Sequence, residues 1–121
     1  MKVLIVDDHP LLLIGLRHIF ADTPGEIETL EASDFEQAFA LIRVNSNIDW
    51  ICLDLQLPGS SGFDFIAEMR ARGIVIPVVV LTANENPETV HRALEHGVLA
   101  YLSKSSPKAE RISAFQKIAN G

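Results

Sequence analysis

The sequence lacks the features of a disulfide-stabilised, membrane-spanning or nucleic-acid-binding chain. Its single cysteine, Cys52, cannot form an internal disulfide, and no apolar run approaches the roughly 20 residues that a bilayer-spanning helix needs. Basic residues are also few: 10 lysines and arginines stand against 16 aspartates and glutamates, which gives a net charge of −6. A surface of that sign repels DNA and anionic lipid. We therefore expect a soluble cytoplasmic domain that contacts neither nucleic acid nor membrane.

The length and the hydrophobic content fit one folded domain. With 121 residues, the chain is long enough to bury a core and too short for two ordinary domains. A hydrophobic fraction of 48% excludes intrinsic disorder. The sequence contains no internal repeat, low-complexity tract or linker. We expect residues 1–121 to form a single domain.

Five short apolar runs divide the sequence, and each is typical of a strand buried in a sheet. They are residues 3–6, 27–30, 50–53, 77–81 and 99–103. The second run is the most polar, which indicates a position near the edge of the sheet. The fourth run is the most apolar and β-branched, which predicts a central strand.

A segment with helical spacing of its apolar residues follows each predicted strand. These segments begin near Pro10, Phe35, Phe63, Pro87 and Pro107. Ser33 and Glu36 have the spacing of a capping box for the second helix, and Gly97 is expected to end the fourth. Alternating strands and helices with short connections predict a doubly wound α/β fold, a (βα)5 sandwich with one five-stranded parallel sheet and helices on both faces.

Polar residues that can carry chemistry follow four of the five predicted strands. Asp7 and Asp8 follow the first strand, Asp54 the third, Thr82 the fourth and Lys104 the fifth. In such a sheet, ligands bind beyond the carboxyl ends of the strands, where the strand order reverses. The pattern is expected for the flavodoxin-like order 2-1-3-4-5, with a pocket above strands 1, 3, 4 and 5.

Three carboxylates at one end of a sheet repel one another, and a hard divalent cation with oxygen ligands is the usual relief. Mg²⁺ held by Asp8, Asp54 and a backbone carbonyl just past Asp54 meets this need. The cation would bridge to a phosphate whose other oxygens contact Lys104 and Thr82. This arrangement suits phosphoryl transfer to a carboxylate.

The strand ends carry four motifs that occur together in one family. They are Asp7-Asp8, Leu53-Asp54-Leu55-Gln56-Leu57-Pro58-Gly59 with Gly62, Leu81-Thr82-Ala83, and Tyr101-Leu102-Ser103-Lys104. In this order they resemble the receiver domain of two-component response regulators, over essentially all 121 residues. Each motif alone is common, whereas the ordered set is very specific. The opening Asp7-Asp8-His9-Pro10 with Gly15-Leu16 resembles the NarL/FixJ branch, whose members carry a LuxR-type helix-turn-helix domain after the receiver.

The resemblance implies a phosphorylation site and a metal site. Asp54 corresponds to the phospho-acceptor, and Asp7 and Asp8 correspond to the acidic pair around Mg²⁺. The backbone carbonyl of Gln56 corresponds to the third protein ligand of the metal, beside Asp54 itself.

The resemblance also implies a phosphate-contacting group and a conformational switch. Lys104 and Thr82 correspond to the residues that contact the phosphoryl group, and Thr82 with Tyr101 corresponds to the switch pair. Two positions depart from the family pattern. Residues 97–100 read Gly-Val-Leu-Ala where Gly-Ala-x-Gly is common, and Ser105 replaces a frequent proline, which makes a cis peptide after Lys104 costlier by roughly 2 kcal/mol or more.

The family implies three partners. A sensor histidine kinase would donate the phosphoryl group, a second copy would form a homodimer on phosphorylation, and a DNA-binding output domain would belong to the full-length protein. Residues 118–121 resemble the last receiver helix running into a linker, so we expect the output domain to lie outside this chain. Two dimer surfaces remain open, helix 1 with helix 5, and helix 4 with strand 5 and helix 5.

Most of these residues also have an ordinary structural interpretation when taken alone. Asp7 and Asp8 suit the N-terminus of the first helix, Thr82 suits a strand end, and Lys104 suits a solvated loop. Asp54 is the exception, because a carboxylate at the end of a central strand is costly unless something compensates it. The joint occurrence favours a functional site.

Three other functions stay open at the level of sequence. A Mg²⁺-dependent phosphatase of similar topology usually has Asp-x-Asp after its first strand, and Asp7-Asp8 lacks that spacing. A flavin-binding domain needs a Ser-, Thr- or Gly-rich phosphate loop at this place, where the two acids would repel the phosphate. A receiver that has lost phosphorylation is disfavoured, because every pocket position is filled.

The remaining candidates for chemistry are assigned to the surface or the core. The four histidines show no ligand spacing and are expected at the surface; they are His9, His18, His91 and His96. Cys52 lies in a predicted buried strand and is expected to be inert packing.

Overall fold

Five parallel strands form one sheet in the part of the chain that the computed structural model describes, residues 1–22, 27–57 and 60–119. The strands are β1 (Lys2–Val6), β2 (Glu28–Ala32), β3 (Trp50–Leu53), β6 (Val78–Thr82) and β7 (Ala100–Ser103). Their order across the sheet is β2-β1-β3-β6-β7. This is the predicted order 2-1-3-4-5 when only the strands of this sheet are counted, so the predicted doubly wound α/β fold is confirmed. Of the predicted motifs, Pro58, Gly59, Asn120 and Gly121 lie outside the described residues.

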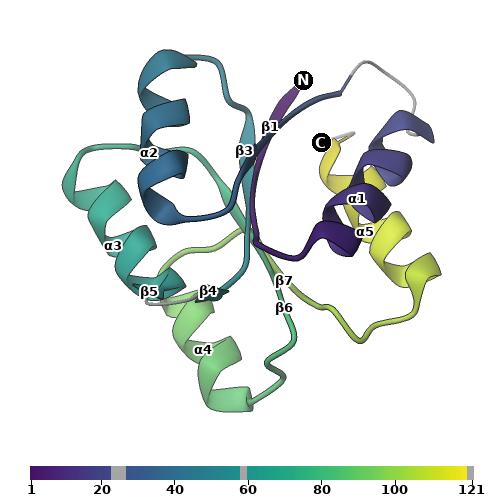
Figure 1. The fold of residues 1–121 in the computed structure, drawn as a ribbon. Helices are drawn as coiled ribbons and strands as arrows, with labels where there is room; N and C mark the ends of the chain where they lie inside the picture. The colour runs from purple at the N-terminus through teal and green to yellow at the C-terminus, as the bar shows by residue number, and fades with distance from the viewer. Residues whose placement is uncertain (23–26, 58–59, 120–121) are drawn as a thin grey trace.

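Helices cover both faces of the sheet (Figure 1). On one face lie α1 (Pro10–Asp22) and α5 (Lys108–Ala119), and on the other lie α2 (Phe35–Val44), α3 (Gly62–Ala71) and α4 (Pro87–Glu95). None of the described helices is long and apolar enough to cross a membrane.

The core has two halves, one on each face of the sheet, because successive strand residues point to opposite faces. Val3 and Ile5 of β1 pack toward α1 and α5, with Phe115. Leu4 and Val6 belong to the cluster on the other face. Both faces of the central strands are therefore buried, which explains why these strands read as continuous apolar runs and not as an alternating pattern.

An aromatic group anchors α1 and α5 to the sheet. The ring of Phe20 meets the rings of Trp50 and Phe115 edge to face, with centroids 5.8 Å and 5.5 Å away. Trp50 and Phe115 are stacked at 5.9 Å. Such pairs stabilise beyond the area they bury, so this group fixes the two helices on their face. Cys52 lies in the same cluster and is 2% exposed; burial raises the pKa of its thiol, which stays neutral.

Four strands differ from their predicted bounds. β1 begins one residue earlier than predicted, at Lys2. The second strand, predicted at residues 27–30, is β2 (Glu28–Ala32) and pairs residue by residue with β1, from Lys2 opposite Glu28 to Val6 opposite Ala32. It continues through the charged Glu31 because the Arg17 guanidinium of α1 binds that carboxylate. β6 begins and ends one residue later than predicted, and β7 begins one residue later.

The predicted capping box at Ser33 and Glu36 is wrong by one residue. Asp34 is the N-cap of α2, and its carboxylate accepts a hydrogen bond from the Gln37 N–H (2.7 Å). The Gln37 side chain in turn accepts from the Ser33 N–H (2.9 Å). The spacing of three residues is kept, but a carboxylate is a stronger acceptor than a hydroxyl and is favoured at a helix N-terminus. The expected ends of the fourth helix are confirmed, since Asn86 caps α4 and Gly97 follows it with a positive φ of 76°.

A short antiparallel pair that the sequence did not predict follows β3. β4 (Gln56–Leu57) pairs with β5 (Ser60–Ser61), and α3 begins directly afterwards at Gly62. The Gly62 N–H donates to the Leu55 carbonyl (3.0 Å). A Cβ added at Gly62 would lie 2.7 Å from the Leu55 Cα and 3.3 Å from the Asp54 carbonyl oxygen. The start of α3 thus packs against the backbone that follows Asp54.

We expect Gly62→Ala to destabilise the fold by about 1–3 kcal/mol, because the new methyl group meets backbone that cannot yield. Gly15→Ala is the matched control, since a Cβ there has no neighbour within 4 Å and replacing a helical glycine stabilises by roughly 0.5–1 kcal/mol. Urea unfolding followed by circular dichroism measures both. Equal stabilities for the two variants would contradict the packing described here.

Candidate functional site

The sheet itself places the predicted site residues at one edge. The Asp7 N–H donates to the Ala32 carbonyl of β2 (3.0 Å), and the Asp54 N–H donates to the Val6 carbonyl of β1 (3.0 Å). The Lys104 N–H donates to the Thr82 carbonyl (2.8 Å). Asp7, Asp54 and Lys104 therefore lie one residue beyond their strands but are still held by bonds that extend the ladder of the sheet.

Lys104 joins the two most buried acids. Its Nζ lies 2.9 Å from Asp7 Oδ2 and 2.9 Å from Asp54 Oδ2, and each aspartate is only 2% exposed. Burial lowers the pKa of Lys104, but the hydrogen bonds and the negative charges of Asp7 and Asp54 outweigh it and raise the pKa overall. The ammonium group therefore stays charged and offsets the repulsion between the two carboxylates.

Backbone donors hold the other oxygens of the two buried acids. Asp7 Oδ1 accepts from the His9 N–H (2.9 Å), and Asp54 Oδ1 accepts from the Gln56 N–H (3.0 Å). The second bond places the main chain of Gln56 beside the Asp54 carboxylate. Each buried acid thus has a backbone partner on one oxygen and Lys104 on the other.

Asp8 differs from Asp7 and Asp54, because one of its oxygens lacks a donor. Its side chain is 31% exposed, yet Oδ1 is a buried atom with no hydrogen-bond partner among the described residues. The His9 ring nitrogen lies 3.3 Å from this oxygen. An unpaired carboxylate oxygen beside two further carboxylates fits a divalent cation, which supplies the missing positive charge.

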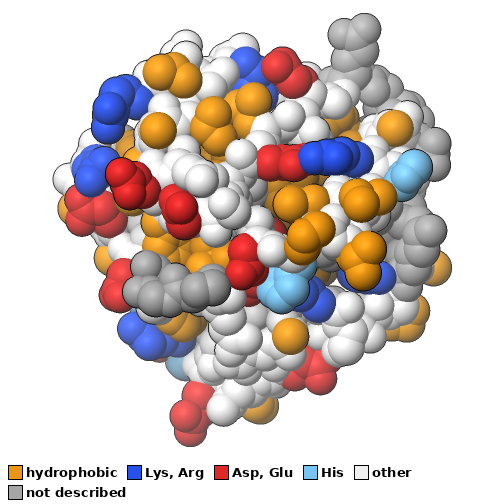
Figure 2. Space-filling model, in the orientation of Figure 1, with side chains coloured by type: hydrophobic (Ala, Val, Ile, Leu, Met, Phe, Trp, Pro, Cys, Tyr) orange, Lys and Arg blue, Asp and Glu red, His pale blue; other side chains and the backbone are white. Residues whose placement is uncertain are grey.

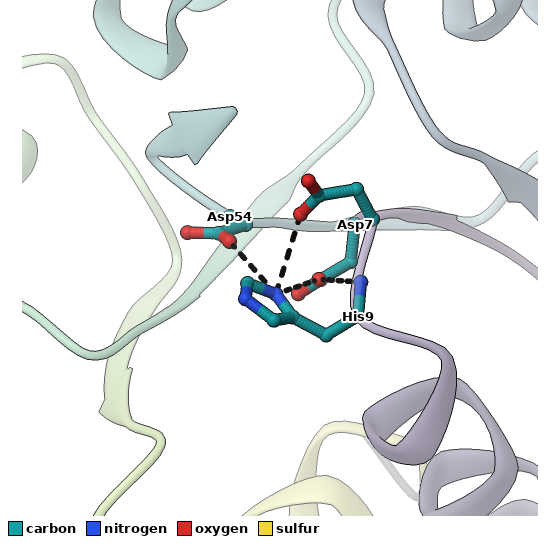
Figure 3. A group of neighbouring side chains, drawn as sticks. Asp7, His9 and Asp54 are labelled. Atoms are coloured by element: carbon teal, nitrogen blue, oxygen red, sulfur yellow. Dashed lines mark hydrogen bonds and ion pairs between the residues drawn. The ribbon is translucent and has the colours of Figure 1, made fainter. Parts of the chain in front are cut away.

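His9 belongs to the site, although the sequence analysis treated it as one of four scattered surface residues. Its ring is 59% exposed, but Nδ1 lies 2.7 Å from Asp7 Oδ1 and 3.7 Å from Asp54 Oδ2. Figure 3 shows this nitrogen between the two labelled carboxylates. One atom each of Asp7, Asp8, His9 and Asp54 lies within 4.8 Å of the others. The only signal in the sequence was that His9 follows the acid pair directly.

The site opens to the surface. Acidic side chains and a histidine gather near the centre of the face in Figure 2, beside hydrophobic side chains that lie over α1. Leu11 and Ile14 of α1 are 85% and 47% exposed. An incoming group can therefore reach the carboxylates from this face.

Thr82 and Tyr101 bond to the loop between β6 and α4. Thr82 is fully buried, and its hydroxyl oxygen accepts from the Asn84 N–H (3.4 Å). The Tyr101 hydroxyl donates to the Asn84 carbonyl (2.5 Å), and burial together with the charge of Glu85 raises its pKa. Within the described residues, neither hydroxyl forms a hydrogen bond with Asp54 or Lys104. Thr82 and Tyr101 thus share one partner, Asn84 of the loop after β6.

A second link between the loops involves Glu85, which no sequence motif singled out. Glu85 Oε1 accepts hydrogen bonds from the hydroxyls of Ser103 and Ser105, at 2.6 Å each. These bonds hold the pKa of Glu85 below its usual range. They join the loop after β6 to both sides of Lys104. We call this group the Glu85 clasp.

The peptide after Lys104 is trans, since the described backbone has no cis peptide bond. The family's cis peptide is thus absent where Ser105 replaces proline. This agrees with the cost of a cis bond without proline, roughly 2.5–4 kcal/mol.

Comparison with known proteins identifies the family. A model of the response regulator receiver domain matches residues 3–116. The chain belongs to the response regulator receiver domain family. It is 33% identical to the nitrate/nitrite response regulator protein NarP of Escherichia coli over 120 residues, which are 99% of this chain and 55% of NarP. The chain thus spans about half the length of the curated relatives it matches.

Solved receiver structures have the same fold. The Mn²⁺-bound form of the response regulator Rcp1 is 26% identical, with a TM-score of 0.83 over 98% of this chain and 91% of the other. A LuxR-family two-component response regulator from Aurantimonas is 28% identical, with a TM-score of 0.83 over 99% of this chain and 85% of the other. The relatives agree with the NarL/FixJ branch. Receiver domains interact with histidine kinases and bind Mg²⁺ or Mn²⁺ in an acidic pocket, and this receiver has an aspartate cluster of that kind.

We expect Lys104→Met to lower the free energy of unfolding by roughly 3–5 kcal/mol in metal-free buffer near neutral pH, because it leaves two buried carboxylates without their cation. Because the two acids raise the pKa of Lys104 in the folded state, the stability that the ion pair contributes is lost as the pH rises through that value, so the deficit of the variant should shrink at alkaline pH. Lys117→Met, on the exposed side of α5, is the matched control. Urea unfolding at several pH values gives the result, and a deficit independent of pH would contradict the ion-pair assignment.

The Glu85 clasp predicts a specific titration. Replacing both serines, Ser103→Ala with Ser105→Ala, should return the pKa of Glu85 toward its ordinary value. In the wild type, the clasp contributes stability above the ordinary pKa and loses it as the pH falls through the lower folded-state value. NMR titration of the Glu85 carboxyl carbon measures the shift. Ser113→Ala, on an exposed position of α5, should leave the titration unchanged; an unchanged titration in the double variant would disprove the clasp.

Proposed function

We propose that this receiver accepts a phosphoryl group on Asp54 and switches conformation in response. The observation that supports the proposal best is the geometry around Asp54: a buried carboxylate whose Oδ2 lies 2.9 Å from the Lys104 ammonium group. The Asp7 carboxylate shares the same lysine, and Asp8 has an oxygen without a donor. This combination holds a nucleophile, a cation for phosphoryl oxygens and ligands for a divalent metal in one place.

The donor in the cell is a phosphohistidine of a sensor histidine kinase. An oxygen of the Asp54 carboxylate attacks the phosphorus, the bond from phosphorus to the histidine nitrogen breaks, and the released imidazole takes up a proton. The product is an acyl phosphate on Asp54, which water later hydrolyses to the carboxylate and inorganic phosphate. The domain thus takes part in both its own phosphorylation and its own dephosphorylation.

The residues of the pocket have separate roles in this chemistry. Lys104 balances the negative charge of the phosphoryl oxygens, because its Nζ already lies beside the accepting carboxylate. Asp7, Asp8, Asp54 and the backbone carbonyl of Gln56 would hold Mg²⁺. When bound, Mg²⁺ would supply positive charge that offsets the charge of the phosphoryl oxygens.

Thr82 and Tyr101 would report phosphorylation to the surface. Among the described residues, the Thr82 hydroxyl has one partner, the Asn84 N–H at 3.4 Å, so it can exchange this weak bond for one to a phosphoryl oxygen at low cost. Since the Tyr101 hydroxyl is bonded to the Asn84 carbonyl, a movement of Thr82 and its loop changes the partner of Tyr101. The phosphoryl group adds a charge of about −1.5 to −2, which biases this two-state element.

The wider function follows from the family. We assign residues 1–121 to one receiver domain of a longer cytoplasmic transcription regulator, with a LuxR-type DNA-binding output domain beyond this chain. Phosphorylation would promote a homodimer. Both surfaces considered for it carry exposed apolar side chains: Leu11 and Ile14 on α1, and Leu94 and Leu99 near α4 and β7.

Incubation with Mg²⁺ and acetyl phosphate should add the mass of one phosphoryl group to the wild-type protein, and none to Asp54→Asn. Intact-mass spectrometry measures both. Asp64→Asn is the control, because Asp64 is an exposed carboxylate on α3 and should leave labelling unchanged. The proposal fails if the wild type stays unlabelled or if Asp54→Asn is labelled as well as the wild type.

A further inference from the structure

The His9 ring nitrogen lies between partners of opposite character. Nδ1 is 2.7 Å from Asp7 Oδ1, an acceptor, and 2.9 Å from Lys104 Nζ, a donor. A ring nitrogen carries either a hydrogen or a lone pair. If Nδ1 carries a hydrogen, it can donate to Asp7 Oδ1 but repels the Lys104 ammonium. If Nδ1 carries a lone pair, it can accept from Lys104 but repels Asp7 Oδ1. No protonation state of His9 satisfies both neighbours.

The distances around this nitrogen match those between neighbouring ligands of one metal ion. Nδ1 lies 2.7, 3.3 and 3.7 Å from oxygens of Asp7, Asp8 and Asp54. Ligands about 2.1 Å from an octahedral ion lie roughly 3 Å from their neighbours and about 4 Å from the opposite ligand. All four atoms are within 4.8 Å of one another, so one cation can contact them together. Such a cation also gives the Asp8 Oδ1 atom the partner that it lacks among the described residues, and it takes the place of Lys104 at the Nδ1 lone pair.

We infer that His9 is a nitrogen ligand of the metal ion in this pocket. The inference rests on the proposed function for the location of the metal site and adds the identity of one ligand. Its consequence is a change in metal preference. Mg²⁺ selects oxygen ligands and gains little from imidazole, whereas first-row ions such as Ni²⁺ bind imidazole well. This receiver therefore favours such ions over Mg²⁺ more strongly than a pocket made of carboxylates alone.

His9 is suited to this role by its position in the chain. The backbone N–H of His9 donates to Asp7 Oδ1, and this hydrogen bond fixes the backbone at the start of α1. The ring is 59% exposed, so it can adjust to an entering ion without disturbing the core. Lys104 lies among the same groups and competes with the ion when no phosphoryl group is present.

The test compares metal binding by wild type and His9→Phe, which keeps an aromatic ring but has no ring nitrogen. Isothermal titration calorimetry of the unphosphorylated protein should show Ni²⁺ affinity falling by about tenfold or more, the scale on which changes around a metal site act. Mg²⁺ affinity should change by less than about threefold. His18→Phe, an exposed position on α1, controls for non-specific binding at surface histidines.

Pulsed electron paramagnetic resonance gives an independent result. Mn²⁺ bound at less than one equivalent should show a nitrogen coupling from imidazole in the wild type and in His18→Phe, and none in His9→Phe. Equal losses of Ni²⁺ and Mg²⁺ affinity, or a coupling that persists in His9→Phe, would overturn the inference. If either of these results is found while Asp54 is still phosphorylated, the proposed function holds and only the role of His9 is wrong. If Asp54 is not phosphorylated but the nitrogen coupling from His9 is present, the proposed function is wrong and His9 is still a metal ligand.

Discussion

The shared ion pair of Lys104 with Asp7 and Asp54 is the constraint on which the site depends. Two carboxylates buried to 2% exposure cannot remain charged side by side without a nearby cation. Lys104, which follows the edge strand β7, provides this cation. The ion pair therefore links the acids that follow the inner strands β1 and β3 to an edge strand. The pocket is therefore held by the packing of the whole sheet and not by one loop.

The sheet also explains why the pocket is preorganised. Asp7, Asp54 and Lys104 each donate a backbone hydrogen bond to a neighbouring strand, so these positions inherit the rigidity of the core. After Asp54, the start of α3 packs against the chain, with Gly62 on the backbone of Leu55. The loop that carries Asn84 and Glu85 is attached to β7 by the side-chain hydroxyls of Tyr101 and Ser103. Acids held by the sheet beside a loop held by side-chain bonds form an arrangement that suits a switch.

The sequence predicted the parts that depend on local pattern. Apolar runs located the five strands of the sheet, and the polar residues that follow them located Asp7, Asp54 and Lys104, because parallel strands bring their carboxyl ends together. The bounds of β2 were missed because Glu31 needs Arg17, fourteen residues earlier in sequence, to join a strand. The true cap of α2 differed by one residue, a choice that spacing alone does not decide.

Other parts of the site depend on contacts between distant segments, which pattern does not reveal. Glu85 is an ordinary exposed acid until β7 places Ser103 and Ser105 beside it. His9 looked like a surface residue because its spacing to other histidines was uninformative, and its neighbours in space are carboxylates. The pair β4–β5 is too short, at two residues per strand, to show a period.

The aromatic group around Trp50 has a consequence for spectroscopy. Trp50 begins β3 and Asp54 follows its end, so about four strand steps, roughly 13 Å, separate the backbone of Trp50 from that of Asp54. Trp50 is the chain's single tryptophan, and its ring is enclosed by Phe20 and Phe115. Its fluorescence should therefore report loss of the core but should not be quenched by ions in the pocket. A dye or a tryptophan introduced near the acids would be needed to follow ion binding by fluorescence.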